Sequence, residues 1–184
     1  MERRLLAAAS RLLAEEGPHA LTVRRLAEEA GTTTMSLYSR FGGKQGIVDA
    51  LYREGFAVLA AAQSEVMDDG NALDRLRAMC RTYRRVAREH ATHYAVMTRQ
   101  AFPDFEPTPA SRQVAVATFT TLVTACAACV AEGSLRGNPE ILAYQLFGLC
   151  HGMVSVEAMG NLPGSDEGEQ RYDDAVAALL RGLV

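Results

Sequence analysis

Several residue types are scarce in this 184-residue chain, which has no tryptophan, four cysteines and a single lysine. Four cysteines are too few for a disulfide-stapled scaffold. We therefore expect reduced thiols and a cytoplasmic location. The imbalance of one lysine against 18 arginines is interpreted as genomic bias and not as a functional signal.

The chain also lacks a large excess of charge of either sign. Its net charge of −3 argues against a protein that coats nucleic acid through bulk charge. The charge is unevenly distributed, because residues 1–53 carry +2 and the remaining residues carry −5. The apolar fraction of 48% excludes a disordered chain. The asymmetry favours two parts, of which the first faces an anionic partner.

No segment has the pattern of a signal peptide, because charges flank both sides of the apolar residues near the N-terminus. Two uncharged stretches, 113–131 and 141–156, are long. The first contains four threonines and two cysteines, whereas a lipid-exposed span is richer in large aliphatic side chains. We expect no membrane partner and predict that both stretches are buried in a helical bundle or an oligomer.

Apolar residues recur at three- and four-residue spacing along nearly the whole chain, and no stretch alternates as a strand would. Thr22 and Thr33 are good N-caps, while Gly17, Gly31 and Gly42 stop helices. The predicted helices end at Glu16, begin after Thr22 and Thr33, and continue over 44–67, 72–89, 91–101, 110–132, 139–159 and, after a loop at 160–168, to about 183. The fold class is therefore all-α, with about nine helices.

The most informative segment is Leu21–Leu51, with the sequence LTVRRLAEEAGTTTMSLYSRFGGKQGIVDAL. Two short helices joined by a glycine-bearing turn predict a helix–turn–helix, in which the second helix enters the DNA major groove. Its outward side chains are hydroxyls and one arginine, with no acid to repel phosphate. The N-terminus at Thr22 is suited to binding a phosphate.

The run Leu-Thr-Val-x-x-Leu-Ala-x-x-Ala-Gly-Thr-Thr-Thr-x-Ser-Leu-Tyr-x-x-Phe-x-x-Lys resembles the DNA-binding domain of the TetR family of transcriptional regulators, over residues 3–51. The resemblance implies a helix–turn–helix domain at 1–47 and an effector-binding and dimerisation domain at 48–184. It implies that the DNA-contacting residues are Thr22, Arg24, Thr33, Thr34, Met35, Ser36, Tyr38, Ser39, Arg40 and Lys44. Tyr38 and Lys44 would contact phosphates, and Thr34, Met35, Ser36, Ser39 and Arg40 would face the bases.

The sequence departs from this family in two places. It begins almost inside the first helix, so no basic N-terminal arm is expected to enter the minor groove. Gly42, Gly43 and Gly46 make the exit from the recognition helix rich in glycine, which predicts a looser connection. Residues 146–157 are similar to a subgroup with a Trp-x-x-x-His-Gly signature, with Phe147 in place of the tryptophan.

The resemblance further implies a homodimer that represses transcription from a palindromic DNA operator and is released by a small apolar effector. Helices 139–159 and 169–183 would pair with their mates, through uncharged 141–156 and the apolar stripe Val176–Leu183. Methionine and aromatic side chains are the candidates for an effector pocket, although they are also typical of a core. These are Met79, Tyr83, Met97, Phe102, Phe105, Phe119, Phe147 and His151.

The alternative function is a helical adaptor, or a metal- or ligand-binding bundle that does not bind DNA. No converging titratable groups indicate an enzyme, and no cofactor is expected. Glu89, His90 and His93 share a helix face, but a four-helix metal site needs a second such motif, so no metal is expected. Cys126 and Cys129 are expected to pack in the core, with a redox role as the alternative. The arginines at 77, 81, 84, 85 and 88 predict a solvated helix face, or alternatively a surface for an acidic effector or partner.

Overall fold

The computed structural model describes residues 1–66, 70–160 and 165–183. Those residues form nine α-helices and no strand, which confirms the all-α prediction. The helices are α1 (Glu2–Glu16), α2 (Val23–Glu29), α3 (Thr34–Phe41), α4 (Lys44–Ser64), α5 (Ala72–Glu89), α6 (Ala91–Met97), α7 (Pro109–Ala131), α8 (Pro139–Ala158) and α9 (Ser165–Arg181).

The predicted helix ends around the helix–turn–helix are confirmed. The hydroxyl of Thr22 accepts a hydrogen bond from the Arg25 backbone N–H, and that of Thr33 accepts one from Ser36. Gly42 ends α3 in the left-handed conformation, with φ 69°. Side-chain capping and a glycine stop therefore set both ends of α3.

Two helix boundaries differ from the prediction. Helix α6 ends at Met97 and not near 101, because Arg99 has a left-handed φ of 62° that no helix continues through. Helix α9 begins at Ser165, inside the predicted loop 160–168, and Glu167 lies in its first turn, where the helix dipole favours acids. Residues 67–69 and 161–164 lie outside the described residues.

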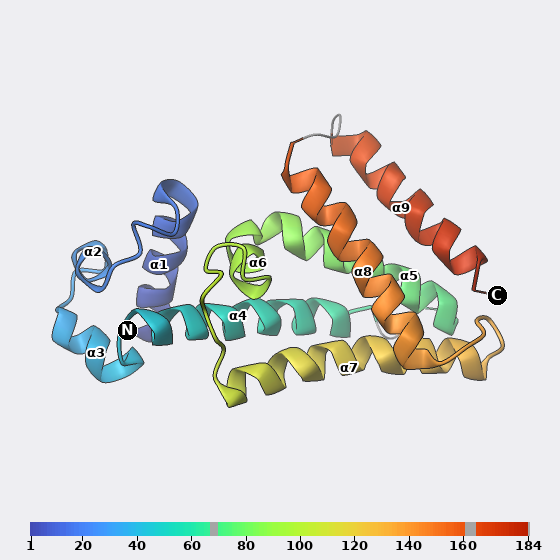
Figure 1. The fold of residues 1–184 in the computed structure, drawn as a ribbon, viewed down its shortest axis with the longest axis horizontal. Coiled ribbons are helices and arrows are strands. Elements are labelled where there is room, and N and C mark those ends of the chain that lie inside the picture. Colours follow the sequence, from blue (N-terminus) through green and yellow to red (C-terminus); the bar gives the residue numbers. More distant parts are fainter. Residues whose placement is uncertain (67–69, 161–164, 184) are drawn as a thin grey trace. The chain divides into compact units, whose positions relative to one another are not determined.

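The chain forms two compact units, of which the first comprises Met1–Val58 and His90–Ala115. In this unit α1 packs on α2, and α2 packs on α3 (Figure 1). The core includes Leu5, Leu26 and Leu37, which have no exposed surface. Tyr52 and Phe105 pack against each other in the same core, with ring centroids 5.7 Å apart.

A buried carboxylate also lies in the first unit. Asp49 on α4, with 7% of its surface exposed, accepts hydrogen bonds from the Thr108 backbone N–H at 2.9 Å and the Ser111 hydroxyl at 2.6 Å. The Arg53 guanidinium lies 3.6 Å away. These partners satisfy the buried charge and fix the first turn of α7 against α4.

The second unit comprises Leu59–Glu89 and Val116–Val184. In it α8 packs side by side with α9 and also against α5 (Figure 1). The Tyr172 hydroxyl on α9 donates to the Cys80 carbonyl on α5 at 2.7 Å. Val176 and Leu180 are buried in this core, so the structure assigns them to the chain's own packing and not to the predicted contact with a second copy.

Helices α7 and α8 are long and apolar enough to cross a membrane by length and composition alone. Only 22% of the apolar window of α7 and 28% of that of α8 are buried within the single chain. The single chain therefore does not bury these helices on most sides, and of the two settings predicted for them only an oligomer would cover the remaining apolar surface.

Candidate functional site

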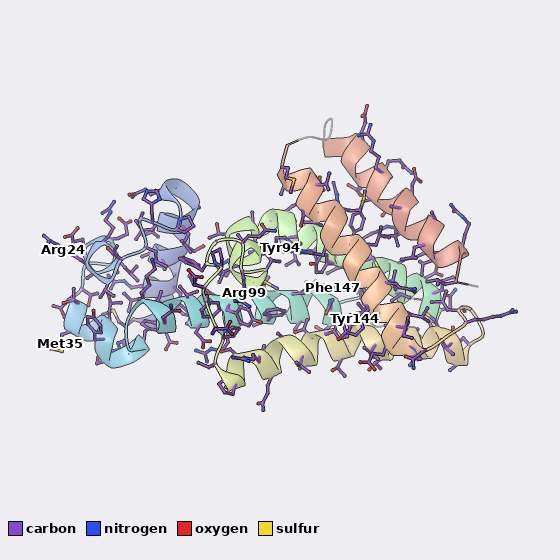
Figure 2. All side chains as sticks on the ribbon, in the orientation of Figure 1. Arg24, Met35, Tyr94, Arg99, Tyr144 and Phe147 are labelled. Atoms are coloured by element: carbon purple, nitrogen blue, oxygen red, sulfur yellow. The ribbon has the colours of Figure 1, made fainter. Side chains whose placement is uncertain are left out.

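The outer surface of α2 and α3 contains the residues predicted to contact DNA. All of them are exposed except Ser36, which is half-buried. They are Thr22, Arg24, Thr33, Thr34, Met35, Ser36, Tyr38, Ser39, Arg40 and Lys44. Figure 2 shows Arg24 and Met35 projecting outward from α2 and α3. The structure therefore brings the predicted contact residues to one accessible part of the first unit.

The position of α3 is fixed by its opposite face. Leu37 is fully buried, and Phe41 packs against the same core. The outward face has hydroxyl groups, the Tyr38 phenol and the Arg40 guanidinium, with no carboxylate in the helix. Such a surface can donate to phosphate and base acceptors without repelling the anionic backbone.

Lys44 lies at the start of α4, beside this surface. Its ammonium group is 3.5 Å from the Pro18 carbonyl oxygen and 5.3 Å from the centroid of the Phe102 ring. No carboxylate pairs with it among the residues that the structure describes. Lys44, Phe102 and Phe105 line a cleft of about 440 Å³ in the first unit. The Lys44 cation is accessible to an anion.

The glycines after α3 meet definite steric requirements. Gly43 has φ 118°, and a Cβ atom at Gly46 would lie 1.7 Å from the Phe41 carbonyl oxygen. Only glycine allows α4 to begin so close to the end of α3. The structure therefore corrects the prediction of a loose connection, since these glycines permit close packing.

The candidate effector residues separate into two sets. Met97, Phe102 and Phe105 belong to the first unit, whereas Met79, Tyr83, Phe119, Phe147 and His151 belong to the second. In the second unit, Phe147 on α8 meets the rings of Tyr83 and Phe119 with centroids 6.2 Å away in each case, and stacks on His151 at 5.8 Å. Tyr144, which the sequence did not single out, lies 4.7 Å from Phe119. Phe147 and Tyr144 are labelled on α8 in Figure 2.

The prediction of a solvated arginine face is wrong for Arg84. Its side chain is 7% exposed, and it donates to both carboxylate oxygens of Glu157, at 3.0 and 2.7 Å. This pair joins α5 to α8. Arg81, Arg85 and Arg88 do remain exposed, so the helical spacing identified the stripe but not the member that faces α8.

The cysteine and histidine candidates show no open site. Cys126 and Cys129 are fully buried, and burial, followed by the nearby Cys129 thiol, raises the pKa of Cys126 to about 12. His93 lies 3.1 Å from a Glu54 carboxylate oxygen. Within the described ranges, no group of three or more metal-ligating side chains converges.

The second solved structure in this comparison has the same fold as the first and a very different sequence. A protein with unknown function from Rhodococcus sp. RHA1 is 28% identical, with TM-score 0.84 and coverage of 99% of this chain and 94% of that one. The fatty acid degradation regulator FadR from Bacillus halodurans is 15% identical, with TM-score 0.81 and coverage of 97% and 94%. The likeness to FadR shows a common fold alone.

A curated relative is the HTH-type transcriptional repressor KstR2 of Mycobacterium tuberculosis, 38% identical over 76 residues. The match spans 41% of this chain and 38% of the relative. Residues 5–51 match the family described as "Bacterial regulatory proteins, tetR family", and residues 76–180 match "Tetracyclin repressor-like, C-terminal domain". The chain therefore belongs to the TetR family of bacterial regulatory proteins.

Proposed function

We propose that this protein is a cytoplasmic, homodimeric transcriptional repressor that binds a palindromic DNA operator and is released by a small apolar effector. Residues 1–47 form the DNA-binding domain, and 48–184 bind the effector and a second copy. The observation that carries the proposal is the acid-free, hydroxyl- and arginine-bearing outer face of α3, held in place by the buried Leu37.

The proposed contacts follow from the geometry of a helix–turn–helix. The second helix lies in the major groove, with its N-terminal residues against base edges. Tyr38 and Lys44 flank the helix and bind phosphates, and Arg40 reaches a base edge. Thr22 and Arg24, at the start of α2, approach the backbone, where N-terminal N–H groups favour an anion.

DNA binding is tested by selecting duplexes from a random pool with the purified full-length protein. An enriched palindrome supports the proposal, and the absence of any enriched sequence refutes it. Tyr38→Ala is expected to weaken binding to every sequence, whereas Arg40→Ala is expected to change the base preference at one position by about 1–3 kcal/mol. Unchanged affinity in Tyr38→Ala would contradict this docking.

The proposed dimer surface is the exposed face of α8. Ile141 and Tyr144 are each 59% exposed, and Met159 is 68% exposed. Gly148 and Gly152 lie between them, and a Cβ atom at either meets nothing within 4 Å. Small residues on an apolar helix face allow a second helix to approach closely.

Gly152→Arg tests the dimer cleanly, because the open space around Gly152 leaves room for a side chain within the single chain. The variant is expected to be monomeric at micromolar concentration in analytical ultracentrifugation, while the wild type is dimeric. Ala7→Arg, on an exposed position of α1, is the matched control and remains dimeric. A monomeric wild type, or a dimeric Gly152→Arg variant, would contradict the proposal.

The proposed effector site adjoins the aromatic cluster of Tyr83, Phe119 and Phe147 in the second unit. The similarity of 146–157 to the Trp-x-x-x-His-Gly subgroup supports a role for Phe147 and His151 there. A solved relative is named as a ketosteroid regulator, and FadR as a fatty acid degradation regulator. A ketosteroid and a fatty acid are therefore the first probes, and the effective one raises the melting temperature and releases the selected duplex.

A further inference from the structure

Met35 is the most exposed large apolar side chain among the residues that the structure describes, at 75%. In the described part of the first unit, the other exposed large hydrophobics are Met1 at the terminus and Tyr38, which also lies on α3. Met35 is the second residue of α3, and Leu37 is fully buried. Two residues correspond to a rotation of about 200° around a helix, so Met35 points away from the core.

The neighbouring hydroxyls are partly used within the helix. The Thr33 hydroxyl accepts from the Ser36 N–H at 3.2 Å, and the Ser39 hydroxyl donates to the Ser36 carbonyl at 3.1 Å. Met35 has only a thioether, which is a weak acceptor, so it cannot distinguish bases by hydrogen bonds. The N-terminal position on α3 nevertheless places it where such helices meet base edges.

We propose that Met35 recognises a thymine, by packing its side chain against the C5-methyl group of one thymine in each half-site. This inference rests on the proposed DNA-binding function. The thymine methyl is the apolar group that the major groove presents, and apolar side chains recognise it by contact. The flexible, unbranched methionine side chain can adapt its shape to a methyl group beside the polar atoms of the groove.

The test replaces thymine by uracil, which removes the methyl group and keeps every hydrogen-bonding atom. The duplex selected by the full-length protein is synthesised with each thymine replaced in turn, symmetrically in both half-sites, and dissociation constants are measured by fluorescence anisotropy at fixed salt. Losing one buried methyl-sized contact changes an equilibrium constant about fourfold. A symmetric replacement at the recognised position is therefore expected to weaken wild-type binding about tenfold.

The same replacement is expected to change the affinity of Met35→Ala less than twofold, whereas Met35→Leu retains a clear preference for thymine. Alanine, leucine and methionine are all good helix formers, so both variants are expected to fold. Equal melting temperatures of the three proteins are the check on folding.

Two results would overturn the assignment while leaving DNA binding intact. In the first, no position shows a thymine preference that depends on Met35, or the selected half-site has no thymine. In the second, Met35→Ala weakens binding to selected and scrambled duplexes equally, as a contact with the DNA backbone would. Failure to enrich any duplex refutes the DNA-binding function itself, and the assignment to Met35 with it.

Discussion

Removing the negative charge of Glu157 is expected to destabilise the second unit much more than removing a surface charge. The Arg84 side chain is 7% exposed and that of Glu157 is 20% exposed, and two hydrogen bonds join them. In Glu157→Gln the buried guanidinium loses its counter-charge but keeps one amide oxygen as an acceptor. The remaining carboxylate near Arg84 is Glu169, which is 3.8 Å away and 68% exposed.

Breaking a buried ion pair by removing one partner costs about 3–5 kcal/mol. The retained acceptor places Glu157→Gln at the lower end, at about 3 kcal/mol, which corresponds to a decrease of about 6–12 °C in melting temperature for a chain of this size. The matched control is Glu89→Gln. Glu89 pairs with Arg85 one helical turn away, and their side chains are 54% and 48% exposed. The control is expected to cost about 0.5 kcal/mol or less.

The assay is urea unfolding followed by circular dichroism, at one protein concentration because dimerisation contributes to stability. Arg84→Met combined with Glu157→Leu is expected to be close to the wild type, because neither buried charge remains. Equal costs for Glu157→Gln and Glu89→Gln would refute the reasoning, since they would mean that water screens the Arg84 pair as well as it screens a surface pair.

Four further outcomes are expected. Thr22→Ala, which removes the hydroxyl that caps α2, is expected to lower the free energy of unfolding by about 1 kcal/mol in urea titrations, and no change would show that the cap is redundant. Gly46→Ala places a Cβ atom 1.7 Å from the Phe41 carbonyl oxygen, so a loss of about 1–3 kcal/mol and weaker DNA binding are expected by the same titration and by anisotropy. Lys44→Ala is expected to lower the salt dependence of DNA binding by about 0.9 per phosphate contact, hence about two for a dimer, and an unchanged slope would exclude this contact. Because burial raises the pKa of Cys126 to about 12, iodoacetamide at pH 8 is expected to modify it only after unfolding, as judged by mass spectrometry, and rapid labelling of the folded protein would contradict that burial.

Local signals predicted the first unit well. Thr22, Thr33 and Gly42 act through their immediate neighbours in the chain, so their capping roles are visible in the sequence. The exposure of the α3 surface followed in the same way from helical spacing around Leu37. The short distance between Gly46 and Phe41 was not predictable, because it depends on the angle between two helices.

The errors arose where long-range packing decides. Helical spacing grouped Arg84 with its exposed neighbours, and its partner Glu157 lies 73 residues later in the chain. Val176 and Leu180 form an apolar stripe whether they face the same chain or a second copy, so the pattern alone did not distinguish these two environments. The buried Asp49 did leave a signal, since it interrupts the apolar run Ile47-Val48 and Ala50-Leu51.

The accessible ammonium group of Lys44 gives this protein a single chemical handle at the expected DNA surface. Apart from the N-terminal amine, no other primary amine occurs in a chain with one lysine. An acylating reagent would therefore produce one internal adduct, beside the recognition helix. With the N-terminal adduct as the internal reference, the yield of that one modified peptide would report operator occupancy directly, without any engineered label.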